Sequence, residues 1–143
     1  MIFGYKGVNW LLSTHCEQQT IGFEKSILGF VEEYTTYRSV HEETLKAPCG
    51  VMAVCFVNSS YCQEDSIDPR LNINAPDVDA TIKSNADDCT ANIFIKTDFT
   101  KAIGFSNKVV LKDDLFQCFP MRNGEFRFLF TGLGRKTLVE SGW

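Results

Sequence analysis

The sequence predicts an α+β domain in which one main amphipathic helix, at about residues 20–38, packs on a mostly antiparallel sheet built largely from the C-terminal half. Two observations predict this class. Apolar residues recur at helical spacing early in the chain, and they alternate with polar residues around an Asn-Gly turn late in it. The chain has 143 residues, of which 44% are apolar and 22% are charged. This is the length and balance of one domain, so we expect residues 1–143 to form a single globular domain.

The helix between Thr20 and Arg38 is predicted from its apolar positions, which lie three or four residues apart: Phe23, Ile27, Phe30, Val31, Tyr34 and Tyr37. Thr20 is expected to be its N-cap, because a threonine hydroxyl can accept a hydrogen bond from an amide of the first helical turn. A second, short helix is expected at residues 76–84, where Pro76 is followed by acidic residues that suit the positive end of a helix dipole.

Several segments have the patterns of strands. Residues 2–12 carry Val8, Trp10 and Leu12 at alternate positions, which predicts a strand or extended segment, and residues 51–57 form a short, continuous apolar run. Ile93 and Ile95 at alternate positions predict another strand, and the segment at residues 109–119 predicts one or two more.

The clearest local signal is Asn123-Gly124, the pair that supplies the two positive-φ residues of a tight hairpin turn. Phe126, Phe128 and Phe130 follow at alternate positions, so they share one face of a strand. That face is expected to be the core face covered by the helix, and residues 136–143 are expected to return as a short element.

Six cysteines stand at positions 16, 49, 55, 62, 89 and 118. The N-terminal residues do not form the apolar core of a signal peptide, and no window approaches the roughly 18 apolar residues of a membrane span. We therefore expect free, buried thiols in a cytoplasmic protein that does not contact a membrane.

Composition favours a non-enzymatic protein that binds another protein in a regulatory, inhibitory or adaptor role, including that of a viral accessory protein. The chain has two histidines, cysteines at irregular spacing and no phosphate-binding loop. Few side chains are therefore available for catalysis, and no cofactor is expected. The chain holds 12 phenylalanines, and exposed aromatic residues would mark a surface for a partner or for a homodimer. The predicted binding residues combine aromatic side chains near the termini with C-terminal bases: Phe3, Tyr5, Trp10, Trp143, Arg127, Arg135 and Lys136.

The alternative is a thiol hydrolase with Cys49 as its nucleophile. The thiol follows a turn and precedes an apolar run, so a helix N-terminus there would lower its pKa. Pro48-Cys49-Gly50-Val51, with Ala53, resembles the nucleophile segment of the MINDY-type deubiquitinases, a papain-like family. The resemblance covers about six residues and implies a cysteine–histidine pair. That family has its histidine after the cysteine, whereas here His41 and His15 both precede it, and either is a candidate base.

A second alternative is the binding of single-stranded nucleic acid by the basic C-terminal third. Residues 101–136 carry seven bases against three acids, and Arg127 is interleaved with phenylalanines as on a base-stacking strand. The net charge of −4 weighs against it, and a core-facing strand shows the same pattern. Residues 132–136 also resemble an anion-binding turn, but a strand end with solvated charges explains them better.

No metal site is predicted. His15, Cys16, Cys49, Cys55 and Cys62 lack the paired spacing of a structural zinc site. Residues 77–88 begin like a calcium-binding loop, but Ile82 stands where the sharp turn needs glycine.

Overall fold

The computed structural model describes residues 2–63, 66–67, 80–112 and 115–143. A long helix, α1 (Ile2–Glu33), precedes two four-stranded sheets. Sheet A contains, in spatial order, β1 (Val40–Lys46), β9 (Glu125–Gly132), β10 (Thr137–Ser141) and β7 (Val109–Val110). Sheet B contains β6 (Thr100–Gly104), β5 (Ile93–Lys96), β2 (Ala53–Val57) and β8 (Phe116–Pro120). The remaining elements are a second helix, α2 (Ala80–Asp87), a short 3-10 helix (Ser59–Tyr61) and the pair β3 (Cys62–Gln63) and β4 (Ser66–Ile67).

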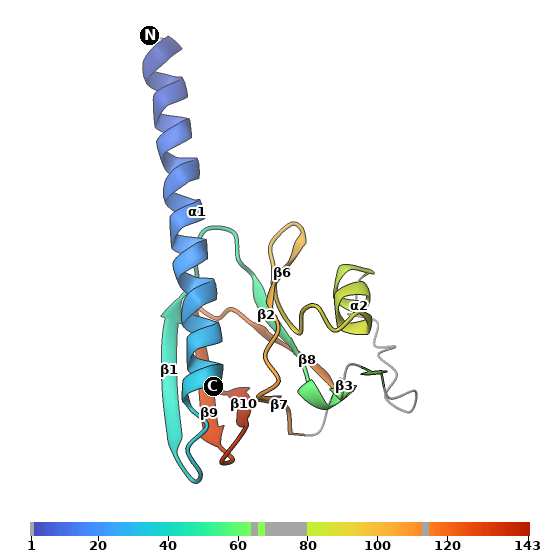
Figure 1. Cartoon of the computed structure of the whole chain (residues 1–143). Helices are drawn as coiled ribbons and strands as arrows, with labels where there is room; N and C mark the ends of the chain where they lie inside the picture. The colour runs from blue at the N-terminus through green and yellow to red at the C-terminus, as the bar shows by residue number, and fades with distance from the viewer. Residues whose placement is uncertain (1, 64–65, 68–79, 113–114) are drawn as a thin grey trace.

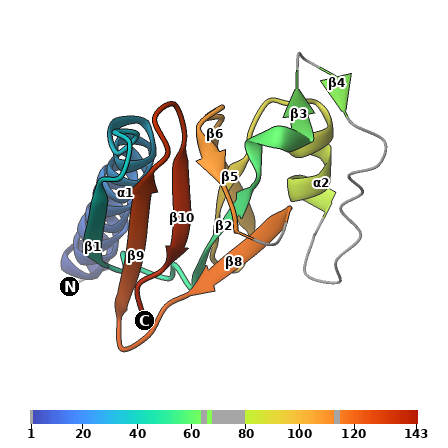
Figure 2. The ribbon, with the colours of Figure 1, turned by 90° about the horizontal axis from the view of Figure 1, so that it is seen from below.

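The pairings within both four-stranded sheets are antiparallel, except that β7 runs parallel to β10. The predicted α+β class is therefore confirmed, with the strands divided between two sheets. Figure 1 shows that the N-terminal half of α1 projects beyond both sheets, while its C-terminal half lies along sheet A. Figure 2 shows the sheets side by side, with α1 at sheet A and α2 at the far side of sheet B.

One core cluster joins α1 to the inner faces of both sheets. At its centre lie Phe126, Phe128 and Phe130 of β9, each at most 1% exposed. Their rings contact Phe23 of α1 at a centroid distance of 5.4 Å and Phe56 of β2 at 6.1 Å. The three alternate phenylalanines thus face the core, as their period-two spacing predicts. A second cluster fills the space between the other face of sheet B and α2.

The predicted strand at residues 2–12 is wrong, because this segment is helical and continuous with α1. The sequence contains neither proline nor glycine between Ser13 and Thr20, so nothing there ends a helix. Thr20 is accordingly not an N-cap: its hydroxyl donates a hydrogen bond of 2.8 Å to the carbonyl oxygen of Cys16. The main helix also ends five residues before Arg38, at Glu33.

The other local predictions are closer to the structure. Asn123 and Gly124 have φ values of 52° and 77°, and reciprocal hydrogen bonds join Arg122 and Glu125, so the tight turn is confirmed. The strands before and after this turn belong to different sheets. The helix expected at residues 76–84 occurs as α2 at Ala80–Asp87, and the first part of the prediction lies outside the described residues.

The prediction of free cysteines is wrong. Cys16 is bonded to Cys49 and Cys55 to Cys118, with Cα–Cα distances of 5.4 Å and 4.0 Å, and Cys89 is also disulfide-bonded. The fold brings together cysteines 33 and 63 residues apart, and spacing along the chain cannot reveal such pairs. Within the described ranges, neither helix is both long and apolar enough to cross a membrane.

Candidate functional site

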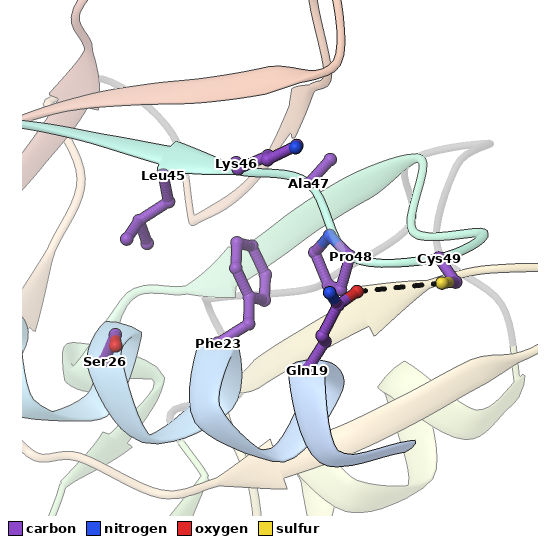
Figure 3. Close-up of a pocket in the computed structure, with 8 residues that line it drawn as sticks. All are labelled: Gln19, Phe23, Ser26, Leu45, Lys46, Ala47, Pro48 and Cys49. Atoms are coloured by element: carbon purple, nitrogen blue, oxygen red, sulfur yellow. Dashed lines mark hydrogen bonds between the residues drawn. The ribbon is translucent and has the colours of Figure 1, made fainter. Parts of the chain in front are cut away.

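A pocket of about 490 Å³ lies between α1 and the chain that leaves β1. Figure 3 shows Gln19 and Phe23 rising from the helix, while Leu45 and Pro48 point back from the strand and the loop. Ser26, Lys46, Ala47 and Cys49 complete the lining. Phe23 is 5% exposed and Pro48 is buried, so the floor is apolar, whereas Gln19, Lys46 and Cys49 are exposed at the rim. The volume lies within the range of about 300–1,000 Å³ that is typical of binding pockets.

The loop wall of the pocket is held in place by three constraints. The amide of Ala47 donates a hydrogen bond of 2.8 Å to the carbonyl oxygen of Gly124. The next four residues form a turn in which the amide of Val51 donates to the carbonyl oxygen of Pro48, and Gly50 takes a φ of 75°. The Cys16–Cys49 disulfide then ties this turn to α1. The pocket is therefore formed before any ligand arrives.

The polar groups of the pocket are few and simple. The hydroxyl of Ser26 donates to the carbonyl oxygen of Gly22, and Gln19 Oε1 lies 3.7 Å from Cys49 Sγ. Lys46 supplies the one charge of the lining, which holds neither a carboxylate nor an imidazole. This chemistry suits an apolar group with a nearby negative charge, and it offers no acid–base pair.

Cys49 and His41 lie toward opposite ends of β1. Cys49 is in the turn beyond the C-terminal end of the strand, so the expected helix N-terminus at this thiol is wrong. His41 is the second residue of β1, and the five steps from it to Lys46 alone span roughly 16 Å. The imidazole stacks on Tyr34 at a centroid distance of 4.0 Å. The structure therefore does not bring His41 to Cys49, and it describes no side chain for His15.

Tyr34 has a role of its own beside His41. Its hydroxyl donates a hydrogen bond of 2.6 Å to Glu43 Oε1, and its ring also stacks on Phe30. This bond to a carboxylate, together with burial, raises the pKa of Tyr34 to about 12. The hydrogen bond joins the residue after the C-terminal end of α1 to β1, and the raised pKa extends it to more alkaline pH than an ordinary tyrosine would allow.

Two of the predicted binding residues do meet, on the face of sheet A away from the core. The Arg127 guanidinium lies 4.3 Å from the ring centroid of Trp143, and Arg122 approaches the same ring at 5.8 Å. Arg127 Nε also lies 3.4 Å from Glu42 Oε1. Trp143 is 42% exposed, so the group forms an aromatic and charged corner at the surface.

The other predicted binding residues lie elsewhere. Arg135 is exposed in the turn between β9 and β10, at the opposite end of sheet A from Trp143. Lys136 Nζ donates hydrogen bonds of 3.0 Å to Ser59 Oγ and to the carbonyl oxygen of Asn107. Phe3, Tyr5 and Trp10 belong to the projecting part of α1, where the structure describes the backbone alone.

Sequence reasoning missed most of the pocket. Gln19 and Lys46 belong to no recognisable motif. The sequence of β1 is mostly polar because one face of the strand is exposed to solvent. The one available signal was Pro48-Cys49-Gly50, which marks the turn that forms the pocket wall.

In the described part of the chain, no group of three or more metal-ligating side chains converges. Cys16, Cys49 and Cys55, which were considered as zinc ligands, are all disulfide-bonded. The first three residues of the calcium-loop pattern, 77–79, lie outside the described residues, and most of the rest forms helix α2. Comparison with known proteins gives no match to a protein-family model, to a curated protein or to a solved structure.

Proposed function

We propose that this protein is a non-enzymatic binding domain that takes an apolar side chain of a partner protein into the pocket between α1 and β1. The observation that carries the proposal is the preformed pocket itself, which has an apolar floor and Lys46 at its rim. Pre-organisation favours binding, because a wall that is already fixed loses little conformational freedom when a ligand enters. Lys46 adds a preference for a partner segment with a carboxylate next to the apolar side chain.

Binding is favoured over thiol hydrolysis for two reasons. The Cys49 sulfur is bonded to Cys16, and only a free thiolate attacks a carbonyl. His41 lies beyond the far side of the pocket, where it stacks on Tyr34. Catalysis by Cys49 would require both reduction of the disulfide and a different base.

Binding of nucleic acid by base stacking is also less favoured. Phe126, Phe128 and Phe130 are each at most 1% exposed, so their rings are not available to bases. Arg127 is engaged by Trp143 and Glu42.

The disulfides bear on where the protein works. Disulfides form and persist in oxidising compartments and are rare in the cytosol. With Cys16, Cys49, Cys55, Cys89 and Cys118 all bonded, we propose an oxidising compartment in place of the expected cytoplasmic location.

The test of the pocket uses two short acetylated peptides, Ala-Phe-Asp-Ala and Ala-Phe-Lys-Ala, titrated into the isotopically labelled protein. We expect the acidic peptide to shift the amide signals of Ser26, Ala47 and Gly50 with a dissociation constant of about 1 mM or below. The basic peptide should bind at least several-fold more weakly, because its ammonium group faces Lys46.

A matched pair of helix variants makes this test specific. Ser26→Phe fills the pocket from α1 and should abolish the shifts, while Ser84→Phe changes an exposed serine of α2 and should leave them unchanged. Shifts that spread elsewhere on the surface, or that survive Ser26→Phe, would show that the pocket is not the binding site.

A further inference from the structure

The free edge of sheet A is the strongest surface feature that the pocket does not use. β1 ends the strand order of this sheet, and Figure 1 shows it as the outermost strand on the side away from sheet B. The amide of Gly132 donates to the carbonyl oxygen of Ser39, and the amide of Ala47 donates to that of Gly124, so odd-numbered residues of β1 face β9. In an antiparallel ladder, the even-numbered residues then point their N–H and C=O groups outward.

The outward-pointing residues also present their side chains to solvent. Val40, Glu42, Thr44 and Lys46 are all exposed, and Val40 is 60% exposed. Along this edge the described chain supplies no further strand. The edge therefore offers a row of unpaired donors and acceptors seven residues long.

We propose that the edge of β1 pairs with β1 of a second copy of this chain, antiparallel and with Thr44 on the two-fold axis. In this register Glu42 lies opposite Lys46 of the second copy, and Lys46 lies opposite its Glu42. Opposite charges and paired threonines at directly facing positions stabilise an antiparallel pair. About six hydrogen bonds would form, two for each facing pair of outward residues.

The charges of the strand select this register. An axis at Glu42, at Glu43 or at Lys46 would place two like charges directly opposite each other, which destabilises a strand pair. An axis at Leu45 would pair no opposite charges, because Glu42 would face Pro48 and Lys46 would face Thr44. A foreign strand without this charge order meets unpaired charges, so the edge favours a copy of itself over other partners.

The environment of Glu42 fits the same arrangement. One of its carboxylate oxygens lies 3.4 Å from Arg127 Nε, on the side of β9. The other oxygen is directed by no interaction within the described residues, and Lys46 of the second copy would approach it from the opposite side. The result is one continuous sheet of eight strands, with α1 of each copy on the same face.

The test is sedimentation of the full chain over protein concentrations from about 1 μM to about 1 mM, the range in which edge-strand dimers of modest area form. We expect a reversible monomer–dimer equilibrium. Thr44→Pro removes one outward N–H that β9 does not use, so it should prevent dimerisation and leave the fold intact. Circular dichroism and the melting temperature report whether it folds.

Charge exchange distinguishes strand pairing from any other contact. Glu42→Lys and Lys46→Glu alone should each raise the dimer dissociation constant at least about tenfold, because like charges then face each other. The double variant Glu42→Lys/Lys46→Glu should restore the dimer, and a mixture of the two single variants should form a heterodimer.

Two results would overturn the proposal: a wild-type protein that stays monomeric at about 1 mM, or a dimer that survives Thr44→Pro and both single charge changes. The proposal goes beyond the pocket but shares Lys46 with it, so dimerisation should reduce the preference for the acidic peptide. Variants that leave Lys46 unchanged distinguish the failure of one proposal from the failure of the other. The Ser26→Phe variant should still dimerise, and Thr44→Pro should still bind the acidic peptide.

Discussion

The hydroxyl of Thr137, fully buried at the start of β10, donates a hydrogen bond of 2.7 Å to the carbonyl oxygen of Val31 in the last turn of α1. It also lies 3.1 Å from the carbonyl oxygen of Tyr34. The last carbonyls of a helix lack partners within the helix, and the amide of Thr35, which would serve Val31, bonds to Glu33 instead. A side chain 106 residues away therefore completes the end of the helix and fixes it to sheet A.

Replacing Thr137 with valine should be costly although the two side chains have the same shape. Thr137→Val leaves buried carbonyl oxygens without a donor, so the free energy of unfolding should fall by about 1–3 kcal/mol. Thr137→Ser keeps the hydroxyl and loses one methyl group, with an expected loss of about 1 kcal/mol. Urea denaturation of the three proteins measures the difference. Equal losses for valine and serine would mean that the hydroxyl contributes nothing.

Two glycines should respond in opposite directions to the same substitution. An ideal Cβ at Gly132 would lie 1.8 Å from the carbonyl oxygen of Thr36, whereas a Cβ at Gly29 meets nothing within 4 Å. Gly132→Ala must displace backbone and should destabilise the protein by roughly 2–4 kcal/mol. Gly29→Ala improves helix propensity and should stabilise it by about 1 kcal/mol. Thermal melting of both variants tests the pair, and a shift of the same sign in both would contradict the packing at Gly132.

Alkaline pH should weaken the fold through two tyrosines. Hydrogen bonding to Glu43 raises the pKa of Tyr34 to about 12, and burial, with a bond to Asp87, raises that of Tyr61 to about 12. In the unfolded chain both lose their protons near pH 10. Stability is therefore fully present below about pH 10 and falls as the pH rises toward about 12, because only the unfolded state releases protons there.

The measurement is the free energy of unfolding at several pH values between about 8 and 11, with tyrosinate absorbance followed in parallel. Tyr61→Phe should flatten the alkaline decline, since it removes one of the two groups. A tyrosinate titration of the native protein centred near pH 10 for all four tyrosines would contradict the raised pKa values.

Local patterns predicted those parts of the fold that depend on neighbours in the sequence. Asn123-Gly124 formed the expected turn, and the alternate phenylalanines after it face the core, because both outcomes follow from backbone geometry over a few residues. The period-two reading of residues 2–12 failed, since seven apolar residues among eleven satisfy helical and strand spacing alike.

The sequence did not predict which segments that are far apart along the chain lie next to each other in the fold. Cys16 meets Cys49, and Cys55 meets Cys118, only because α1 packs on sheet A and β8 pairs with β2. The candidate pocket depends on the same packing, so Gln19 and Lys46 could not have been identified beforehand. Trp143 and Arg127 were both predicted to belong to a binding surface. The structure shows that the two side chains contact each other, and their role in binding a partner stays a prediction.

The two described disulfides should differ in their response to a mild reductant, although they close loops of comparable entropy. Cross-links over 33 and 63 residues are each worth about 4 kcal/mol in the chain-entropy estimate. Their access to solvent differs at one cysteine of each bond: Cys16 and Cys118 are both half-buried, but Cys49 is exposed while Cys55 is 0% exposed beneath α2. Because reduction requires an attacking group to reach sulfur, Cys16–Cys49 should open first in the native protein and Cys55–Cys118 only on unfolding.

Timed reduction followed by alkylation and mass spectrometry gives the order of opening. Cys16→Ser/Cys49→Ser is the matched control, because it removes the early phase and should leave the late phase unchanged. Simultaneous opening of both bonds would mean that the native core does not protect Cys55. If the early phase alone also abolishes binding of the acidic peptide, then the link from Cys49 to α1 is what holds the pocket in its binding shape, since the turn at Gly50 and the amide bond of Ala47 persist without it.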